Sequence, residues 1–419
     1  MLPLLRRPLS LFLVAVACAA LAFNANADEA PPEKITGLNP VQWRVVWQND
    51  PAHEAILSWS TGEAGEVHRV HLRKEGSAEA TIVDCQRSGM YTGTIDDQPL
   101  HFHHARLTEL EPATRYNVQM ESDGHKSPEL HFYTAPADDA PVSLLFGGDS
   151  RSGWEERKQM NRLMVRLSEE QSKAERPPVL ALAHGGDYIG DGRYLTEWSR
   201  WLSDHELTVG PAGRLLPIIA ARGNHDSGPL FNEIFDFPPD DANYYAMDIT
   251  PAVRLVTLNT QVSTAGDQQS WLDSELAAAR PKHRWVACQY HIPAFPAVKV
   301  PGGALQSWVP LFEKYNVDLV CEADGHCIKR TAPIRDYKID PTGVVYIGEG
   351  GLGVGQRTPK ADRWYLNSPQ AKTGSGHHIH LLTFSRDGLT IRTILMDGML
   401  FDEATLQPRK LAVDSAAGE

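Results

Sequence analysis

Polar side chains follow the apolar runs that predict strands in the C-terminal two thirds of the chain. These residues are Asp149, Asp187, Asn224, His225, Asp226, His291, Asp324 and His326. Paired glycines directly before Asp149 and Asp187 favour a close approach of the backbone to a bound group. Carboxylate, amide and imidazole ligands suit Mn, Fe, Zn or Mg ions. Because open α/β sheets place their sites at the carboxyl ends of strands, the sequence predicts a metal centre there.

The elements that position these residues belong to a predicted layered α/β domain over residues 141–402. The predicted strands are 142–146, 179–183, 216–220, 244–248, 253–258, 285–290, 317–321 and 344–348. Apolar residues at helical spacing predict one helix around Met160 to Leu167 and another around Trp271 to Ala279. Residues 379–385 and 389–396 predict a final hairpin, and residues 403–419 are expected to form a C-terminal tail.

Residues 36–136 predict an all-β sandwich in front of the α/β domain. Short strands are expected at residues 41–48, 55–60, 67–74, 102–107, 116–121 and 130–134, separated by turn residues. The segment from Leu110 to Tyr116 has the form LxPxTxY, which predicts a tyrosine corner and resembles fibronectin type III modules. The proline-rich residues 135–141 are expected to form the linker between the two domains.

From about residue 36 to residue 400 the chain resembles the calcineurin-like metallophosphoesterases, preceded by the N-terminal module of purple acid phosphatases. The most specific matches are GNHD at residues 223–226, Gly186-Asp187, and VDLV followed by a His-bearing loop and Arg-Thr-x-Pro at residues 317–333. The resemblance implies a phosphoesterase, and we expect it to favour phosphomonoesters over diesters. Two divalent or trivalent metal ions would activate a bridging hydroxide for in-line attack on the phosphate.

The resemblance also implies individual roles. Asp149 and His326 would hold the first metal, Asp187 would bridge both metals, and Asn224 with His291 would hold the second. His225 would protonate the leaving group, and Asp226 is expected to orient its ring.

Three positions depart from the pattern of the family. Arg151 replaces the His of the DxH motif and is expected to clamp phosphate, because a permanently protonated guanidinium cannot be a ligand. Gly190 stands where purple acid phosphatases have Tyr, so their phenolate-to-iron absorption should be missing. Asp324 occupies a His position and would be an anionic ligand of the second metal that favours Mn or Mg. The alternative alignment places Ile328, which cannot ligate, at the second His.

A rival interpretation is a degenerate family member that binds a phosphorylated or glycan ligand without turning it over. The missing imidazole at Arg151 and the substitution at Asp324 both motivate it. The histidines at 101, 103 and 104 are expected to be structural, and those at 377, 378 and 380 are strand residues with substrate contact as the alternative.

Composition excludes several classes of function. The formal net charge is −13, from 40 Lys and Arg against 53 Asp and Glu, and no basic cluster occurs, which argues against nucleic-acid binding. A positive segment with Arg6 and Arg7, an apolar stretch over residues 11–23 and Ala25-Asn26-Ala27 predict a signal peptide over residues 1–27. We therefore expect a periplasmic or secreted protein without a membrane span, acting on a small phosphate ester. The pairing of Cys85, Cys288, Cys321 and Cys327 stays open.

Overall fold

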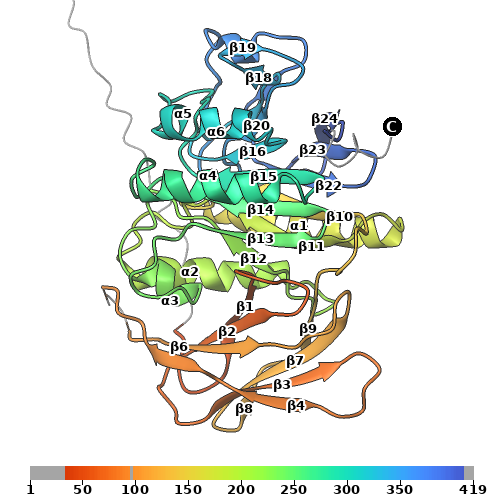
Figure 1. Cartoon of the computed structure of the whole chain (residues 1–419). Coiled ribbons are helices and arrows are strands. Elements are labelled where there is room, and N and C mark those ends of the chain that lie inside the picture. The colour runs from red at the N-terminus through yellow and green to blue at the C-terminus, as the bar shows by residue number, and fades with distance from the viewer. Residues whose placement is uncertain (1–33, 95–97, 410–419) are drawn as a thin grey trace, which may run out of the picture. The chain divides into compact units, whose positions relative to one another are not determined.

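The computed structural model describes residues 34–94 and 98–409 (Figure 1). Its N-terminal part consists of two mainly antiparallel sheets built from short strands rich in β-branched and aromatic residues. The first contains β3 (His68–Lys74), β4 (Thr81–Asp84), β7 (Arg115–Ser122), β8 (His125–Lys126) and β9 (Leu130–Tyr133). The second contains β1 (Val41–Val46), β2 (Ala55–Thr61), β5 (Arg87–Met90) and β6 (His101–Leu107). Side chains such as Trp59, Val70 and Val118 fill the space between them, as predicted for a sandwich.

The predicted tyrosine corner is present at the start of β7. The backbone N–H of Glu111 donates to the Tyr116 hydroxyl at 2.8 Å. The Thr134 hydroxyl donates to the Glu111 carbonyl at 2.7 Å, so the turn is held to the last strand of the sandwich as well. The LxPxTxY segment therefore fixes a corner between strands, as its sequence predicted.

The sandwich and the α/β domain share one sheet, which the sequence did not predict. Strand β1 pairs in parallel with β12 (Ile218–Ala220), with Val46 opposite Ile218. The N–H of Trp47 continues the ladder by donating to the Ile218 carbonyl at 3.0 Å. The linker at residues 135–141 is thus not the only connection between the two predicted domains. The pairing satisfies an edge of β1 that would otherwise present unpaired backbone groups.

The α/β domain is built on two stacked sheets. The ten-stranded sheet adds to β1, β2, β5 and β6 the strands β10 (Val142–Gly147), β11 (Val179–His184), β12, β22 (His378–Phe384), β23 (Leu389–Leu395) and β24 (Leu400–Leu406). The seven-stranded sheet contains β13 (Tyr245–Thr250), β14 (Val253–Thr257), β15 (Trp285–Tyr290), β16 (Leu319–Glu322), β17 (Ile328–Arg330), β20 (Val345–Gly348) and β21 (Lys372–Gly374). A small hairpin pairs β18 (Ile334–Arg335) with β19 (Lys338–Ile339).

Alternation along the strands distributes side chains to both faces of each sheet. Leu144 and Phe146 of β10 face the core between the sheets, together with Ala287 of β15. Leu145, between them, packs instead against the helix on the outer face. Both faces of these strands are therefore buried, which explains their nearly continuous apolar sequence.

Helices cover the outer faces of the two sheets. They are α1 (Trp154–Lys173), α2 (Leu195–His205), α3 (Leu230–Ile234), α4 (Asp267–Ala279), α5 (Ala304–Ser307) and α6 (Val309–Lys314), with 3-10 turns η1 (Glu206–Thr208) and η2 (Trp364–Leu366). The predicted apolar face of α1, with Met160, Leu163 and Met164, packs against the ten-stranded sheet. Leu272 and Leu276 of α4 pack against the seven-stranded sheet.

The C-terminal boundary expected at residue 402 falls inside a strand. The predicted hairpin of β22 and β23 is present, but β24 follows it and pairs antiparallel with β23, from Leu389 opposite Leu406 onward. This edge strand is largely exposed along its length, so it lacks the apolar run that marks a buried strand.

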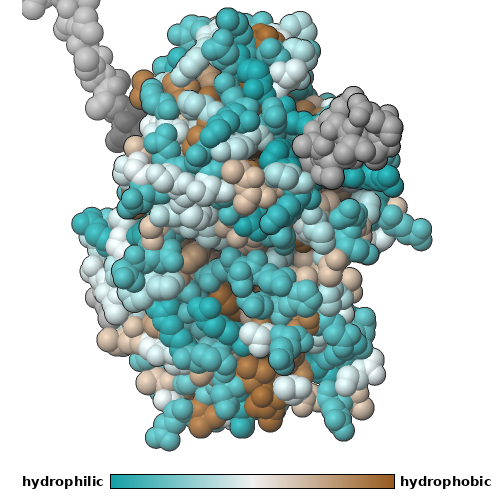
Figure 2. All heavy atoms as spheres, viewed as in Figure 1, coloured by the Kyte–Doolittle hydropathy of each residue, from teal (hydrophilic) through white to brown (hydrophobic). Residues whose placement is uncertain are grey.

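The predicted signal peptide lies outside the described residues. None of the helices in the described part of the chain is long and apolar enough to cross a membrane. One face of the molecule is mostly hydrophilic, with scattered apolar residues (Figure 2). The four cysteines whose pairing was open, Cys85, Cys288, Cys321 and Cys327, are all free thiols.

Candidate metal centre

The predicted site residues lie just beyond the carboxyl ends of β10, β11, β12, β15 and β16. Their turns are tight: Asp149, Asp187, Asp324 and His326 have φ values of 56°, 58°, 67° and 60°. Residues other than glycine rarely adopt this left-handed conformation, and it often marks functional sites. The neighbouring backbone is also close, because a Cβ on Gly223 would lie 2.2 Å from the Asp187 nitrogen. The close approach of the backbone at these turns thus depends on glycine.

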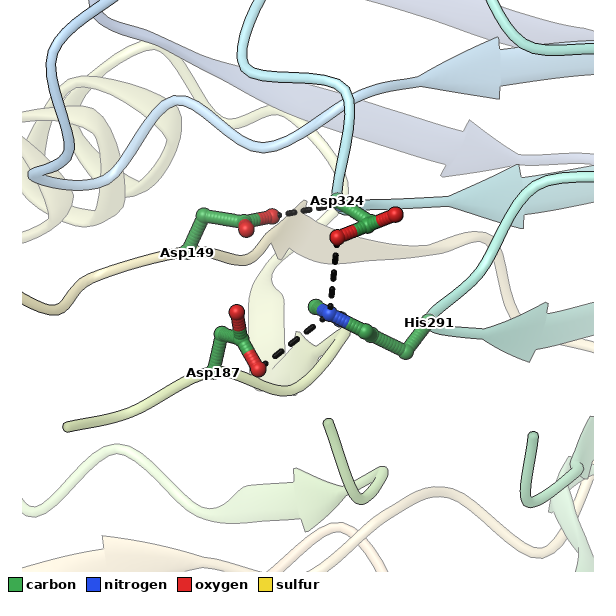
Figure 3. Close-up of side chains that lie close together, drawn as sticks. All are labelled: Asp149, Asp187, His291 and Asp324. Carbon is green, nitrogen blue, oxygen red and sulfur yellow. Dashed lines mark hydrogen bonds and ion pairs between the residues drawn. The ribbon is translucent and has the colours of Figure 1, made fainter. Parts of the chain in front are cut away.

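Four side chains converge in one buried cluster, drawn in Figure 3. Asp149, Asp187, His291 and Asp324 each offer a ligand atom, and these atoms lie within 4.8 Å of one another. The His291 Nε2 is 3.2 Å from Asp187 Oδ1 and 3.5 Å from Asp324 Oδ1 (Figure 3). Three carboxylates brought together in a buried space repel one another, so the arrangement requires compensating positive charge.

The tautomer of His291 suits a metal ligand. Its Nδ1 lies 2.9 Å from the Gly185 carbonyl, which can only accept, so Nδ1 carries the proton. The Nε2 atom then faces the carboxylates and Asn224 Oδ1, which is 3.1 Å away. Burial disfavours the charged ring, but Asp187 and Asp324 outweigh it and raise the pKa of His291. The negative charge of these carboxylates, which favours the protonated His291 ring, also attracts a metal cation.

A second pair of atoms supports a metal ion beside Asp149. Asp149 Oδ1 and His326 Nε2 lie 3.1 Å apart. Both are buried, and neither takes part in a hydrogen bond. Buried polar atoms are nearly always satisfied, so two such atoms facing each other fit a bound cation. With Asp187 nearby, the donor set has the mixed oxygen and nitrogen character that Mn, Fe, Zn and Mg accept, and the residues fit a metal pair.

The remaining predicted metal residues are Asp324 and Asn224. The Asp324 carboxylate belongs to the cluster, and its own N–H donates to Asp149 Oδ2 at 2.8 Å. Ile328, the residue that the alternative alignment would place at the second His, begins strand β17. Asn224 is exposed at the rim, where its amide oxygen approaches His291.

His225 lies at the rim of the cluster. Its Nε2 is 3.9 Å from Asp187 Oδ2, and its side chain is 33% exposed. The Nδ1 lies 2.5 Å from the Gly190 carbonyl, which fixes the proton on that nitrogen. The backbone of Gly190 therefore supports the His225 ring.

The role expected for Asp226 is corrected by the structure. Its buried carboxylate accepts the backbone N–H groups of Asp187, Tyr188 and Gly223 at 2.8, 2.9 and 2.7 Å. The orientation of the His225 ring comes instead from the Gly190 carbonyl. Burial raises the pKa of Asp226 to about 7, and the charge of Asp187 adds to this. Asp226 is therefore a positioning residue that ties the turns after β11 and β12 together.

Two cations approach the cluster, and only one was predicted. Arg151 Nε lies 3.2 Å from Asp187 Oδ2, where its guanidinium borders the site as expected. Lys299 Nζ lies 2.5 Å from Asp324 Oδ1. Burial raises the pKa of Asp324, but His291 and Lys299 outweigh it and lower the pKa to about 2. A single lysine in a loop has no distinguishing pattern, so the sequence held no signal for its position.

Several of the other histidines have structural partners. Those predicted to be structural include His103, which lies 2.8 Å from the Thr61 hydroxyl, and His104, which lies 2.7 Å from the Ser58 hydroxyl. His378 and His380 are buried in β22, and the Thr393 hydroxyl is 3.0 Å from His380 Nδ1.

Comparisons with known proteins agree with this fold and site. Residues 40–134 match the purple acid phosphatase N-terminal domain, and residues 131–327 match the calcineurin-like phosphoesterase family. The chain therefore consists of a purple acid phosphatase N-terminal domain followed by a calcineurin-like metallophosphoesterase domain. The second match includes every predicted site residue, from Asp149 to His326.

Individual relatives are similar over most of the chain. The uncharacterized Mycobacterium tuberculosis protein Rv2577 is 26% identical over 393 residues, which cover 81% of this chain and 67% of the relative. Purple acid phosphatase 18 of Arabidopsis thaliana is 23% identical over 74% of this chain and 68% of its own. The structure of purple acid phosphatase PPD1 from yellow lupin superposes with a TM-score of 0.73 at 17% identity, covering 88% of this chain and 74% of that chain.

Proposed function

We propose that this protein is an exported, metal-dependent phosphoesterase that hydrolyses phosphomonoesters in preference to diesters. The observation that carries the proposal is the buried cluster of Asp149, Asp187, His291 and Asp324. The fold alone does not define an activity, whereas a converging set of buried carboxylates and an imidazole defines a chemistry.

The residues divide naturally between two metal ions. Asp149 and His326 would hold one ion, Asp187 would bridge, and Asn224, His291 and Asp324 would hold the other. The ions supply Lewis-acid activation of water and neutralise charge on the phosphoryl group. The oxygen-rich second position favours Mn or Mg, while Fe and Zn remain compatible with the whole set.

The chain's own residues complete the reaction. Arg151, 3.2 Å from Asp187, offers guanidinium N–H groups to a phosphoryl oxygen. His225 presents Nε2 at the rim and donates a proton to the departing alkoxide oxygen. The Gly190 carbonyl holds the opposite nitrogen protonated, so the ring that gives up its Nε2 proton is left as a defined neutral tautomer.

The experiment compares chelator-stripped protein with protein reloaded with Mn, using an aryl phosphate as substrate. We expect hydrolysis to disappear on stripping and to return with the metal. D187N should lower turnover by about a hundredfold or more, because loss of a bridging ligand exceeds the effect of an outer partner. D191N removes a carboxylate that pairs with Arg193 outside the cluster and should retain activity. Full activity in folded D187N would refute the proposal.

A second candidate is a protein that binds a phosphorylated or glycan ligand without hydrolysing it. The observation that favours this candidate is the ion pair between Asp324 and Lys299. D324H separates the two. A large gain of activity from near zero would indicate an impaired native site, whereas a loss would indicate that Asp324 is a working ligand.

Export is a separate part of the proposal and rests on the composition of residues 1–27. N-terminal sequencing of the protein from the exported fraction should give Asp28 as the first residue. Protein that keeps its first 27 residues in the cytoplasm would contradict export.

A further inference from the structure

Lys299 lies in the segment between β15 and α5 that forms one wall of the cluster. The wall is braced by a second segment of the chain. The Lys360 N–H donates to the Ala297 carbonyl at 2.9 Å, and the Tyr365 hydroxyl donates to the Pro296 carbonyl at 2.6 Å. The Arg363 guanidinium donates to the carbonyl of Lys299 itself at 2.8 Å. Lys299 therefore projects from a fixed backbone.

The ammonium group of Lys299 reaches the cluster from the solvent side. Its Nζ is 2.5 Å from Asp324 Oδ1, and the side chains of Lys299 and Asp324 are 36% and 5% exposed. An ammonium has three N–H donors. The contact with Asp324 uses one of them, and the structure gives no other partner to Nζ among the described residues. Two donors are thus left at the mouth of the site.

Arg151 contacts another carboxylate of the cluster, as Lys299 contacts Asp324. Its Nε is 3.2 Å from Asp187 Oδ2, and its side chain is 18% exposed. Asp187 and Asp324 belong to the same cluster, with ligand atoms within 4.8 Å of each other. Two partly exposed cations therefore border one small site, each resting on a different carboxylate. A phosphoryl group above the cluster would meet both.

We propose that Lys299 binds the substrate phosphoryl group together with Arg151, and that this pair of cations selects dianionic phosphomonoesters over monoanionic diesters. The inference rests on the proposed function. A diester has one negative charge fewer and carries a second substituent in place of an oxygen that could accept from Lys299. The cation pair therefore gains less from a diester than from a monoester.

The test measures binding of inorganic phosphate to Mn-loaded protein by calorimetry, with bound metal measured by mass spectrometry. K299M should raise the phosphate Kd by about tenfold, the usual effect of losing a charge-assisted hydrogen bond, with metal content unchanged. K299R keeps the charge and should stay within about threefold of the wild type. K360M removes an exposed lysine from the bracing segment and should change neither value.

The monoester-to-diester ratio of kcat/KM gives a second readout. With aryl phosphate and bis-aryl phosphate as substrates, K299M should lower this ratio by about tenfold, because only the dianion loses a partner. A merely structural ion pair would affect both substrates equally.

Three results would overturn the inference. An unchanged phosphate Kd in K299M would show that Lys299 is only the counterion of Asp324. A loss of bound metal in K299M would show the same. Wild-type protein that holds Mn without binding phosphate would exclude a phosphoryl site altogether. If the wild type binds phosphate but hydrolyses no ester, the proposed function fails, while the calorimetric comparison still decides the role of Lys299.

Discussion

Substitution of Lys329 by Met should destabilise the fold severely, because this lysine is the counterion of two fully buried carboxylates, Glu322 and Glu349. Its Nζ contacts Glu322, Glu349 at 2.6 Å and the Phe295 carbonyl at 2.9 Å, and all three charged side chains are 0% exposed. Burial disfavours the charged lysine, but the two carboxylates outweigh it and raise the pKa of Lys329.

The size of the expected loss in the free energy of unfolding follows from the contacts that remain in K329M. Glu322 also accepts the Tyr290 hydroxyl at 2.7 Å and the Ala294 N–H at 2.6 Å, and Glu349 accepts the Ala297 N–H at 2.8 Å. These contacts survive in K329M, yet two carboxyl groups lose their counterion without access to water. Removing one partner of a buried ion pair costs about 3–5 kcal/mol, so we expect a loss of this size at pH 8.

The assay is urea unfolding of K329M beside K338M. Lys338 forms an ion pair with Asp336 at 3.3 Å, and both side chains are mostly exposed, at 77% and 82%. Surface pairs of this kind contribute less than about 1 kcal/mol, so K338M controls for the loss of a lysine as such. A K329M loss of less than about 1 kcal/mol at pH 8 would refute the reasoning, because the buried carboxylates would then need no counterion.

The loss should also depend on pH. Burial raises the pKa of Glu349 from 4.5 to about 7, although Lys329 opposes the shift. A carboxyl whose pKa is higher in the folded state contributes stability that is complete below pH 4.5 and is lost as the pH rises through 7. Without Lys329 the native state takes up protons still more readily, so the destabilisation of K329M should be smaller at pH 5 than at pH 8. An equal loss at both pH values would contradict this.

Three further predictions concern the tyrosine corner, the Gly325 turn and the metal. Y116F removes the hydroxyl that accepts the Glu111 N–H at 2.8 Å and should cost about 1 kcal/mol in urea unfolding; an unchanged midpoint would exclude this contribution. G325A would place a Cβ 1.6 Å from Glu349 Oε2, so the free energy of unfolding should fall by about 1–3 kcal/mol and Mn binding should weaken in calorimetry. Unchanged values of both quantities would show that Glu349 moves aside freely and would contradict the prediction. Chelation should lower the melting temperature and Mn should restore it, because a ligand of the native state alone stabilises that state; a melting temperature independent of Mn would contradict a native-state site.

Strands, turns and the order of the site residues could be predicted from the sequence because their signals are local. Alternating or continuous apolar runs bounded by turn residues located most strands, and the polar residue after each run located Asp149, Asp187, His291 and Asp324. Parallel strands end at the same edge of a sheet, so residues far apart in the chain could be expected to meet. Strand β24 was missed because an exposed edge strand has no buried face to mark it.

Contacts between distant segments could not be predicted, because neither periodicity nor motif encodes them. The sequence did not show that β1 pairs with β12, that Asp226 binds backbone N–H groups, or that Lys299 meets Asp324. Each of these contacts depends on how distant segments of the chain come together over the sheets. A single lysine or aspartate has no sequence pattern that fixes its position, because it fits many positions on a surface. The sequence by itself determined which types of metal-ligating side chain are present at the site. Only the tertiary structure decided which charges surround these side chains, because electrostatic interactions depend on distance and burial.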